Sequence, residues 1–111
     1  ALFSEKKIKE AIYNLKMAIQ LRPNDFKAHQ NLGVALFTDQ KTREAINHYK
    51  KAIKLNPNYA KSYFNLGKAQ IQQGEIKKAI HNFRKTLNLK PDHAKAKNSL
   101  KLALLRWQEI Q

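Results

Sequence analysis

The three prolines of this 111-residue chain, Pro23, Pro57 and Pro91, are spaced at intervals of 34 residues. The rest of the sequence repeats with the same period. Residues 1–25 match residues 35–59 at 13 of 25 positions, and residues 26–59 match residues 60–93 at 10 of 34. A fixed period of this length is typical of proteins built by stacking copies of one small structural unit. We therefore expect a repeat array.

Each repeat predicts two α-helices joined by a short polar turn. Apolar and small residues recur three and four residues apart in both halves of the repeat, which is helical spacing. Proline then ends the second helix. The polar residue that follows each proline is expected to accept hydrogen bonds from the first N–H groups of the next helix. In repeat 26–59 the predicted packing residues are His29, Leu32, Gly33 and Leu36, then Ile46, Tyr49, Ala52 and Ile53, and the expected caps along the chain are Asn24, Asn58 and Asp92.

Two glycines recur inside the predicted first helices, at Gly33 and Gly67. Glycine inside a helix costs about 1 kcal/mol relative to alanine, so the recurrence indicates a packing requirement. We expect close approach of the two helices of a repeat, with the small side chains of Ala45 and Ala79 facing the glycines.

At a period of 34 residues the chain carries, in this order, Asn-Leu-Gly, an alanine, an aromatic residue, an alanine or threonine, and a proline. This succession resembles the tetratricopeptide repeat (TPR). The resemblance implies an all-α, right-handed αα-hairpin solenoid of about three repeats with a C-terminal capping helix, from a larger TPR-containing protein. Residues 1–25 resemble the end of a first helix plus the second helix of a partial repeat. Residues 26–59 and 60–93 resemble full repeats, and residues 94–111 a terminal helix.

The terminal segment 94–111 is predicted to be an amphipathic helix, either a cap that covers the preceding repeat or an ordinary first helix without its second helix. Its apolar residues would face that repeat, and its charged residues would face water. The expected covering face is Leu100, Leu104, Leu105, Trp107 and Ile110, and the expected water-facing residues are Lys97, Lys101, Arg106 and Gln108.

The composition argues against an enzyme. The chain has no cysteine, which excludes a disulfide scaffold, a thiolate zinc site and cysteine catalysis. Its four histidines lack the spacing of a helical metal pair, and its three glycines cannot form a phosphate-binding loop. We expect no catalytic residue, metal or cofactor. The lack of cysteine, of a visible signal peptide and of a membrane-spanning segment favours a cytoplasmic location.

The resemblance also implies that the first helices line a concave groove. Asparagine side chains there can bind a peptide backbone, apolar side chains can form pockets, and lysines attract acidic groups. The sequence therefore predicts a protein–protein interaction module or scaffold whose groove binds a peptide segment of acidic character. The expected groove residues are Lys27, Gln30, Asn31, Val34, Phe37, Lys61, Phe64, Asn65, Lys68, Lys95 and Asn98.

The match to grooves that clamp a C-terminal carboxylate is partial. Ser99 stands where such grooves carry arginine, and Gln30 and Val34 replace a lysine and an asparagine. Asn31 and Asn65 also belong to the general repeat pattern, so a structural role for them stays open.

Most of the positive charge lies outside the predicted groove. With 22 Lys+Arg and 8 Asp+Glu the net charge is +14. The second helices carry cations seven residues apart, which places them on one helix face. We call these cations the outer stripe. Three interpretations stay open: a solvated surface, a site for an acidic protein, or a convex face that contacts nucleic acid or anionic membrane. Two further hypotheses are that the chain is an architectural spacer and that it self-associates through exposed array ends. The outer stripe is Lys9, Lys16, Arg43, Lys50, Lys77 and Arg84.

Overall fold

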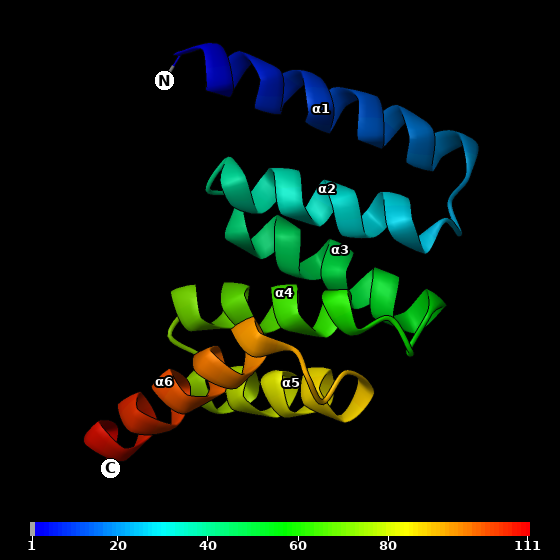
Figure 1. The fold of residues 1–111 in the computed structure, drawn as a ribbon. Helices are drawn as coiled ribbons and strands as arrows, with labels where there is room; N and C mark the ends of the chain where they lie inside the picture. Colours follow the sequence, from blue (N-terminus) through cyan, green and yellow to red (C-terminus); the bar gives the residue numbers. More distant parts are fainter. Residues whose placement is uncertain (1) are drawn as a thin grey trace. The chain divides into compact units, whose positions relative to one another are not determined.

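The computed structural model describes the backbone of residues 2–111 and the side chains from Glu5 onward. This part of the chain forms six α-helices and no strand (Figure 1). It divides into two compact units, Ala1–Pro57 and Asn58–Gln111, with three helices in each. The helices are α1 (Leu2–Leu21), α2 (Phe26–Thr38), α3 (Thr42–Leu55), α4 (Ala60–Gln72), α5 (Ile76–Leu89) and α6 (Ala94–Ile110).

The first unit is an antiparallel hairpin of α2 and α3 with α1 packed against α2 (Figure 1). The face of α2 that meets α3 is fully buried, because Leu32 and Leu36 recur one helical turn apart. Tyr49 and Ala52 of α3 complete this core and are at most 2% exposed.

The second unit repeats the hairpin with α4 and α5, and α6 packs mainly against α5. Its buried core comes from all three helices, and several partly buried apolar side chains pack around it. The fold is thus an all-α helical repeat. The core residues are Phe64, Ile76, Ala79, Ile80, Phe83, Ala96 and Ala103, with Ile71, Leu87, Leu100 and Trp107 against them.

Both recurring glycines make room for an aromatic ring of the facing helix. A Cβ added to Gly33 would lie 2.5 Å from the Tyr49 ring, and one added to Gly67 would lie 2.6 Å from the Phe83 ring. The expected close approach is present, and the atoms nearest to each added Cβ belong to the Tyr49 and Phe83 rings; the buried Ala45 and Ala79 are not among these nearest atoms. The rings occupy that space because the aromatic residue lies one helical turn beyond the alanine on α3 and α5.

The predicted helix caps are also wrong, each by one residue. Asp25, which has extended backbone angles, caps α2 by accepting hydrogen bonds from the N–H groups of Lys27 and Ala28. His93 caps α6 through Nδ1, which accepts from the N–H of Ala96 at 3.0 Å. α4 begins after Tyr59 without a side-chain cap. The residue directly after proline belongs to the turn, and the next residue adopts the extended conformation that a cap requires.

The terminal helix buries part of the expected face, at Leu100 and Trp107, together with two alanines that the prediction did not include. Ala96 and Ala103 are buried, and Leu100 and Trp107 pack beside them, a spacing of four, three and four residues. Leu104, Leu105 and Ile110 are exposed instead of covering the hairpin. The small alanines decide the orientation, because they let the helix backbone approach α5 closely.

Each hairpin has a polar pair between its two helices, and one member of each pair occupies the same repeat position. In the first, Nδ1 of His29 lies 3.2 Å from Nδ1 of His48, and Nε2 of His29 donates to the carbonyl of Pro23 at 2.8 Å. In the second, the amide of Asn82, which is the counterpart of His48, donates to Oε1 of Gln70 at 2.7 Å. These hydrogen bonds satisfy polar groups inside the helix interface.

Candidate functional site

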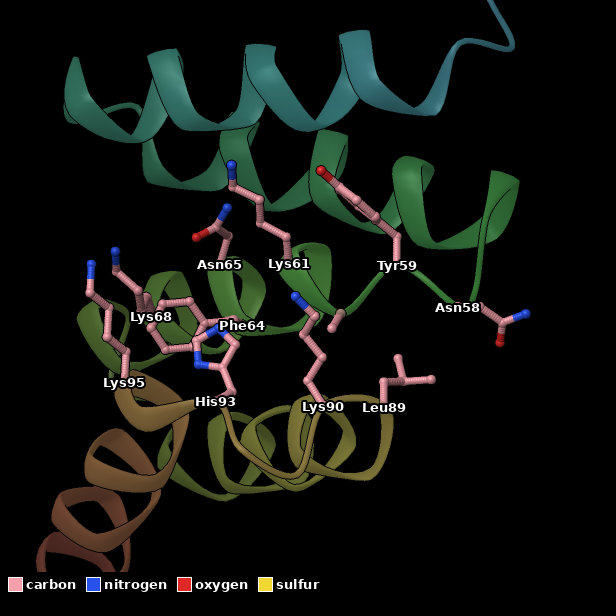
Figure 2. A pocket seen from close by; sticks show the side chains of 11 residues that line it. Asn58, Tyr59, Lys61, Phe64, Asn65, Lys68, Leu89, Lys90, His93 and Lys95 are labelled. Carbon is pink, nitrogen blue, oxygen red and sulfur yellow. The ribbon is translucent and has the colours of Figure 1, made fainter.

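A hollow of about 500 Å³ opens on the second unit, bordered by α4, the α5–α6 connection and the first turn of α6 (Figure 2). We call it the α4/α6 pocket. The residues from α4 recur at spacings of three and four, so they form one face of that helix. Its lining is Asn58, Tyr59, Ala60, Lys61, Phe64, Asn65, Lys68, Leu89, Lys90, His93 and Lys95.

The pocket is strongly cationic. Four lysines line it, and the described lining residues include no carboxylate. Figure 2 shows Lys68 and Lys95 rising at one end of the pocket, while Lys90 comes from the α5–α6 connection. Clustered cations without nearby anions produce a local potential that attracts negatively charged ligands.

Aromatic rings form the inner wall of the pocket. The ring of Phe64 is 8% exposed and contacts the rings of Phe83 and His93, with centroid distances of 5.9 and 4.8 Å. The ammonium of Lys68 lies 5.3 Å from the centroid of the Phe64 ring. A cation over an aromatic face is attracted to it, so this contact holds the Lys68 side chain at the pocket wall.

His93 connects the pocket to the start of α6. Its Nδ1 accepts the hydrogen bond from Ala96 and therefore carries no proton. In the neutral ring the proton is then on Nε2, which is available as a donor to an acceptor in the pocket. Asn65 adds an amide that can both donate and accept.

The structure brings five of the eleven expected groove residues into this pocket: Lys61, Phe64, Asn65, Lys68 and Lys95. Asn98 is exposed on α6 but is not among the lining residues. Lys27, Asn31 and Val34 are exposed on α2, and Phe37 is partly buried there.

Gln30 departs from the expected groove contact, because its side chain is only 1% exposed. Both polar atoms of its amide are buried without a hydrogen-bond partner. It occupies the same repeat position as Phe64, so an amide takes a place where the next repeat carries an aromatic ring.

Sequence reasoning missed the pocket residues that lie between helices, among them Lys90 and His93. It considered only the first helix of each repeat. The sequence does carry a signal for these residues, the proline turn. Pro91 fixes where the connection ends and α6 begins.

The six residues of the outer stripe are all exposed. Lys9 and Lys16 lie on α1, and Arg43 and Lys50 on α3. Lys77 and Arg84 lie on α5, and neither lines the α4/α6 pocket.

From residue 5 onward, no three histidine or acidic side chains are grouped so that they could hold a metal ion. Burial lowers the pKa of His48, as do the neighbouring His29 and Lys16. Burial raises the pKa of the Tyr49 phenol. Among the helices described, none combines the length and apolar character needed to cross a bilayer.

Comparison with family models gives matches to two descriptions of one repeat. A "TPR repeat" model matches residues 1–40 and 39–74, and a "Tetratricopeptide repeat" model matches residues 60–93. A search of curated proteins found no significant match.

Solved structures similar to this chain include MamA, with 35% sequence identity and a TM-score of 0.84. That alignment covers 86% of this chain and 56% of MamA, so the chain spans little more than half of that protein. The first TPR of Spaghetti (RPAP3), bound to the HSP90 peptide SRMEEVD, aligns over 96% of this chain and 84% of its own, with 24% identity and a TM-score of 0.91. The Arabidopsis OM64 TPR domain aligns over 94% and 86%, with 23% identity and a TM-score of 0.89. At such identities the last two similarities concern the fold alone.

Proposed function

Because this chain belongs to the tetratricopeptide repeat family, whose domains are protein–protein interaction modules, we propose that its α4/α6 pocket binds an acidic peptide segment of a partner protein. The observation that carries the proposal is the group of four lysines in a pocket without a described carboxylate. A ligand with several negative charges pairs with these cations, and a neutral or basic peptide leaves them unpaired.

The pocket offers a separate contact for each part of such a ligand. Side-chain or terminal carboxylates of the ligand pair with Lys61, Lys68 and Lys95, which line the pocket. The amide of Asn65 is placed to bind the peptide backbone, and the rings of Phe64 and His93 offer a small apolar wall. The first unit offers side chains of the same types, a lysine, an asparagine and apolar residues. We propose them as further peptide contacts: Lys27, Asn31, Val34 and Phe37.

The peptide SRMEEVD is a suitable probe, since it carries two glutamates and a terminal aspartate and is the ligand bound to the RPAP3 domain. We expect labelled SRMEEVD with a free C-terminus to bind, measured by fluorescence anisotropy. The neutralised peptide SRMQQVN amide should bind at least about tenfold more weakly, because charge-assisted hydrogen bonds to lysine are each worth about 1.5–3 kcal/mol.

Variants of the protein locate the binding site. The double variant Lys61→Ala/Lys95→Ala should lose about tenfold or more in affinity. Lys77→Ala/Arg84→Ala is a matched control, since it removes two exposed cations from α5 in the same unit. Equal losses in both variants would assign the binding to general charge, and a loss in the control alone would move it to the outer stripe. Either result overturns the proposal.

A further inference from the structure

A second hollow of the second unit, of about 360 Å³, lies between α5 and α6. We call it the α5/α6 groove. Four leucines line it, Leu87, Leu100, Leu104 and Leu105, and none of them lines the α4/α6 pocket. Leu104 is 38% exposed and Leu105 is 50% exposed. Contiguous exposed leucines next to a hollow are typical of a surface that binds a partner.

The repeat shows what kind of surface this is. Leu100 and Leu104 stand one period after Leu66 and Gln70, on the face of the first helix that is buried against the second helix of the same hairpin. On the corresponding face of α6, Leu100 is partly buried against the core, and Leu104 is exposed in the described structure. By this correspondence, its shape suits another α-helix.

A second helix of the usual kind does not fit this face. Lys101 stands one period after Gly67, where even a Cβ would lie 2.6 Å from the buried ring of Phe83. An aromatic residue packed in the α5/α6 groove as Phe83 packs against Gly67 would meet the Lys101 side chain. The complementary helix must instead present a small or acidic residue to Lys101.

The charge of the groove selects its occupant further. Lys97 and Lys101 flank the leucines, and the remaining polar lining residue, Gln108, is neutral. A second copy of this chain carries a net charge of +14, and the same face of α6 in that copy would bring lysines against lysines.

Three observations bear on the occupant: the exposed leucines, the lysine at the glycine position and the flanking cations. We infer that the α5/α6 groove binds an amphipathic α-helix of a partner protein. This helix is apolar on one face and acidic along its edge. Its apolar residues lie against Leu104 and Leu105. Its carboxylates pair with Lys97 and Lys101. This helix-in-groove contact is separate from the proposed peptide site.

The test uses two synthetic helical peptides of roughly 18 residues, about five turns. One places leucine and alanine on one face and glutamate along the edges, and the other carries lysine in place of every glutamate. Neither contains tryptophan, so the single tryptophan of the chain, Trp107, reports binding from its place beside the groove on α6. We expect the acidic peptide to change Trp107 fluorescence in a saturable titration, and the basic peptide to bind at least about tenfold more weakly.

Matched variants then locate the site. Leu105→Ser should weaken binding of the acidic peptide about tenfold, and Leu102→Ser should leave it within about twofold. Both leucines are exposed to a similar degree on α6, but Leu102 does not line the groove. Lys97→Glu/Lys101→Glu should reverse the preference between the two peptides. Circular dichroism confirms that each variant remains helical.

Several outcomes would overturn the inference. Equal binding of the two peptides, or equal losses in Leu105→Ser and Leu102→Ser, would show that the groove does not select the helix. Displacement of the helical peptide by SRMEEVD would assign it to the α4/α6 pocket. If sedimentation shows a dimer, and Leu105→Ser dissociates it, the occupant is a second copy of the chain. If the chain binds phosphatidylcholine vesicles with about one-fifth phosphatidylserine, and Leu105→Ser abolishes this binding, the occupant is a membrane.

Discussion

The buried hydroxyl of Ser62 distinguishes this residue from the equivalent positions one period away. The hydroxyl of Ser62 is buried without a hydrogen-bond partner, and the counterparts of Ser62 one period away on either side are the buried alanines Ala28 and Ala96. A buried polar group without a partner costs about 1–3 kcal/mol. Ser62→Ala should therefore raise the free energy of unfolding by about 1 kcal/mol, measured by urea denaturation.

Thr86→Val serves as the comparison for this prediction. The Thr86 hydroxyl is also fully buried, but it donates to the carbonyl of Asn82 at 2.8 Å. Its removal should bring no gain in stability. A loss of stability in Ser62→Ala would show that the Ser62 hydroxyl has a partner in solution.

His48 in the first hairpin makes stability depend on pH. The pKa of His48 is lowered from 6.5, chiefly by burial, then by the neighbouring charges of His29 and Lys16, while Glu44 opposes these effects. The unfolded chain therefore binds a proton at His48 more readily than the folded chain does. The stabilisation is complete above pH 6.5 and is lost as the pH falls through the lower pKa of the folded state.

Replacement of His48 by the residue at its counterpart position isolates this effect. In His48→Asn, which introduces the side chain that Asn82 carries in the second hairpin, the free energy of unfolding should fall less between about pH 7.5 and about pH 5 than in the wild type. Urea denaturation at a series of pH values measures the difference. Parallel curves for the two proteins would assign the pH dependence to other groups.

At the scale of the helices, the contact between Gly67 and Phe83 sets two effects against each other. Alanine favours a helix over glycine by about 1 kcal/mol, but the added Cβ would lie 2.6 Å from a ring that is only 1% exposed. Overpacking in a core costs about 1–3 kcal/mol, and the buried ring has no space into which it can move. Gly67→Ala should therefore lower the free energy of unfolding by about 1–2 kcal/mol.

A double-mutant cycle tests the cause of this loss. In the Phe83→Leu background the ring is absent, so Gly67→Ala should cost less than it does in the wild type. The helix preference of alanine then offsets more of the remaining strain. An equal cost in both backgrounds would contradict the proposed contact.

The helices themselves were predictable, because the proline period and the three-to-four spacing of Leu32, Leu36 and their counterparts repeat so closely. The buried face of α6 was predictable only in part, at Leu100 and Trp107. Leucines surround much of that helix, and Ala96 and Ala103 decide which side meets α5. A hydrophobicity pattern gives alanine little weight, although its small size is what permits the close approach.

The candidate site was predictable only where it lies on a helix. Lys61 and Lys68 follow from the helical spacing of α4. Lys90 and His93 lie in the connection to α6, and their position at the α4/α6 pocket depends on how α6 folds back against the hairpin. Local spacing carries no information on that arrangement.

For the whole molecule, the net charge of +14 should give salt opposite effects on stability and on binding. Like charges repel in the folded chain, and screening removes that repulsion, since the Debye length falls to about 10 Å at about 0.1 M salt. Raising NaCl from about 0.05 to about 0.5 M should therefore raise Tm by a few degrees and weaken the binding of SRMEEVD. Thermal unfolding by circular dichroism and fluorescence anisotropy measure the two effects.

Charge variants separate these two consequences. Lys77→Gln/Arg84→Gln lowers the net charge from +14 to +12 outside the pocket, so it should reduce the salt dependence of Tm and leave that of binding unchanged. Lys61→Gln/Lys95→Gln removes the same charge from the α4/α6 pocket and should reduce both. A Tm that falls with added salt would show that attractive ion pairs outweigh the repulsion. Equal salt dependence of binding in the two variants would mean that the peptide responds to the total charge of the chain and not to the lysines of the pocket.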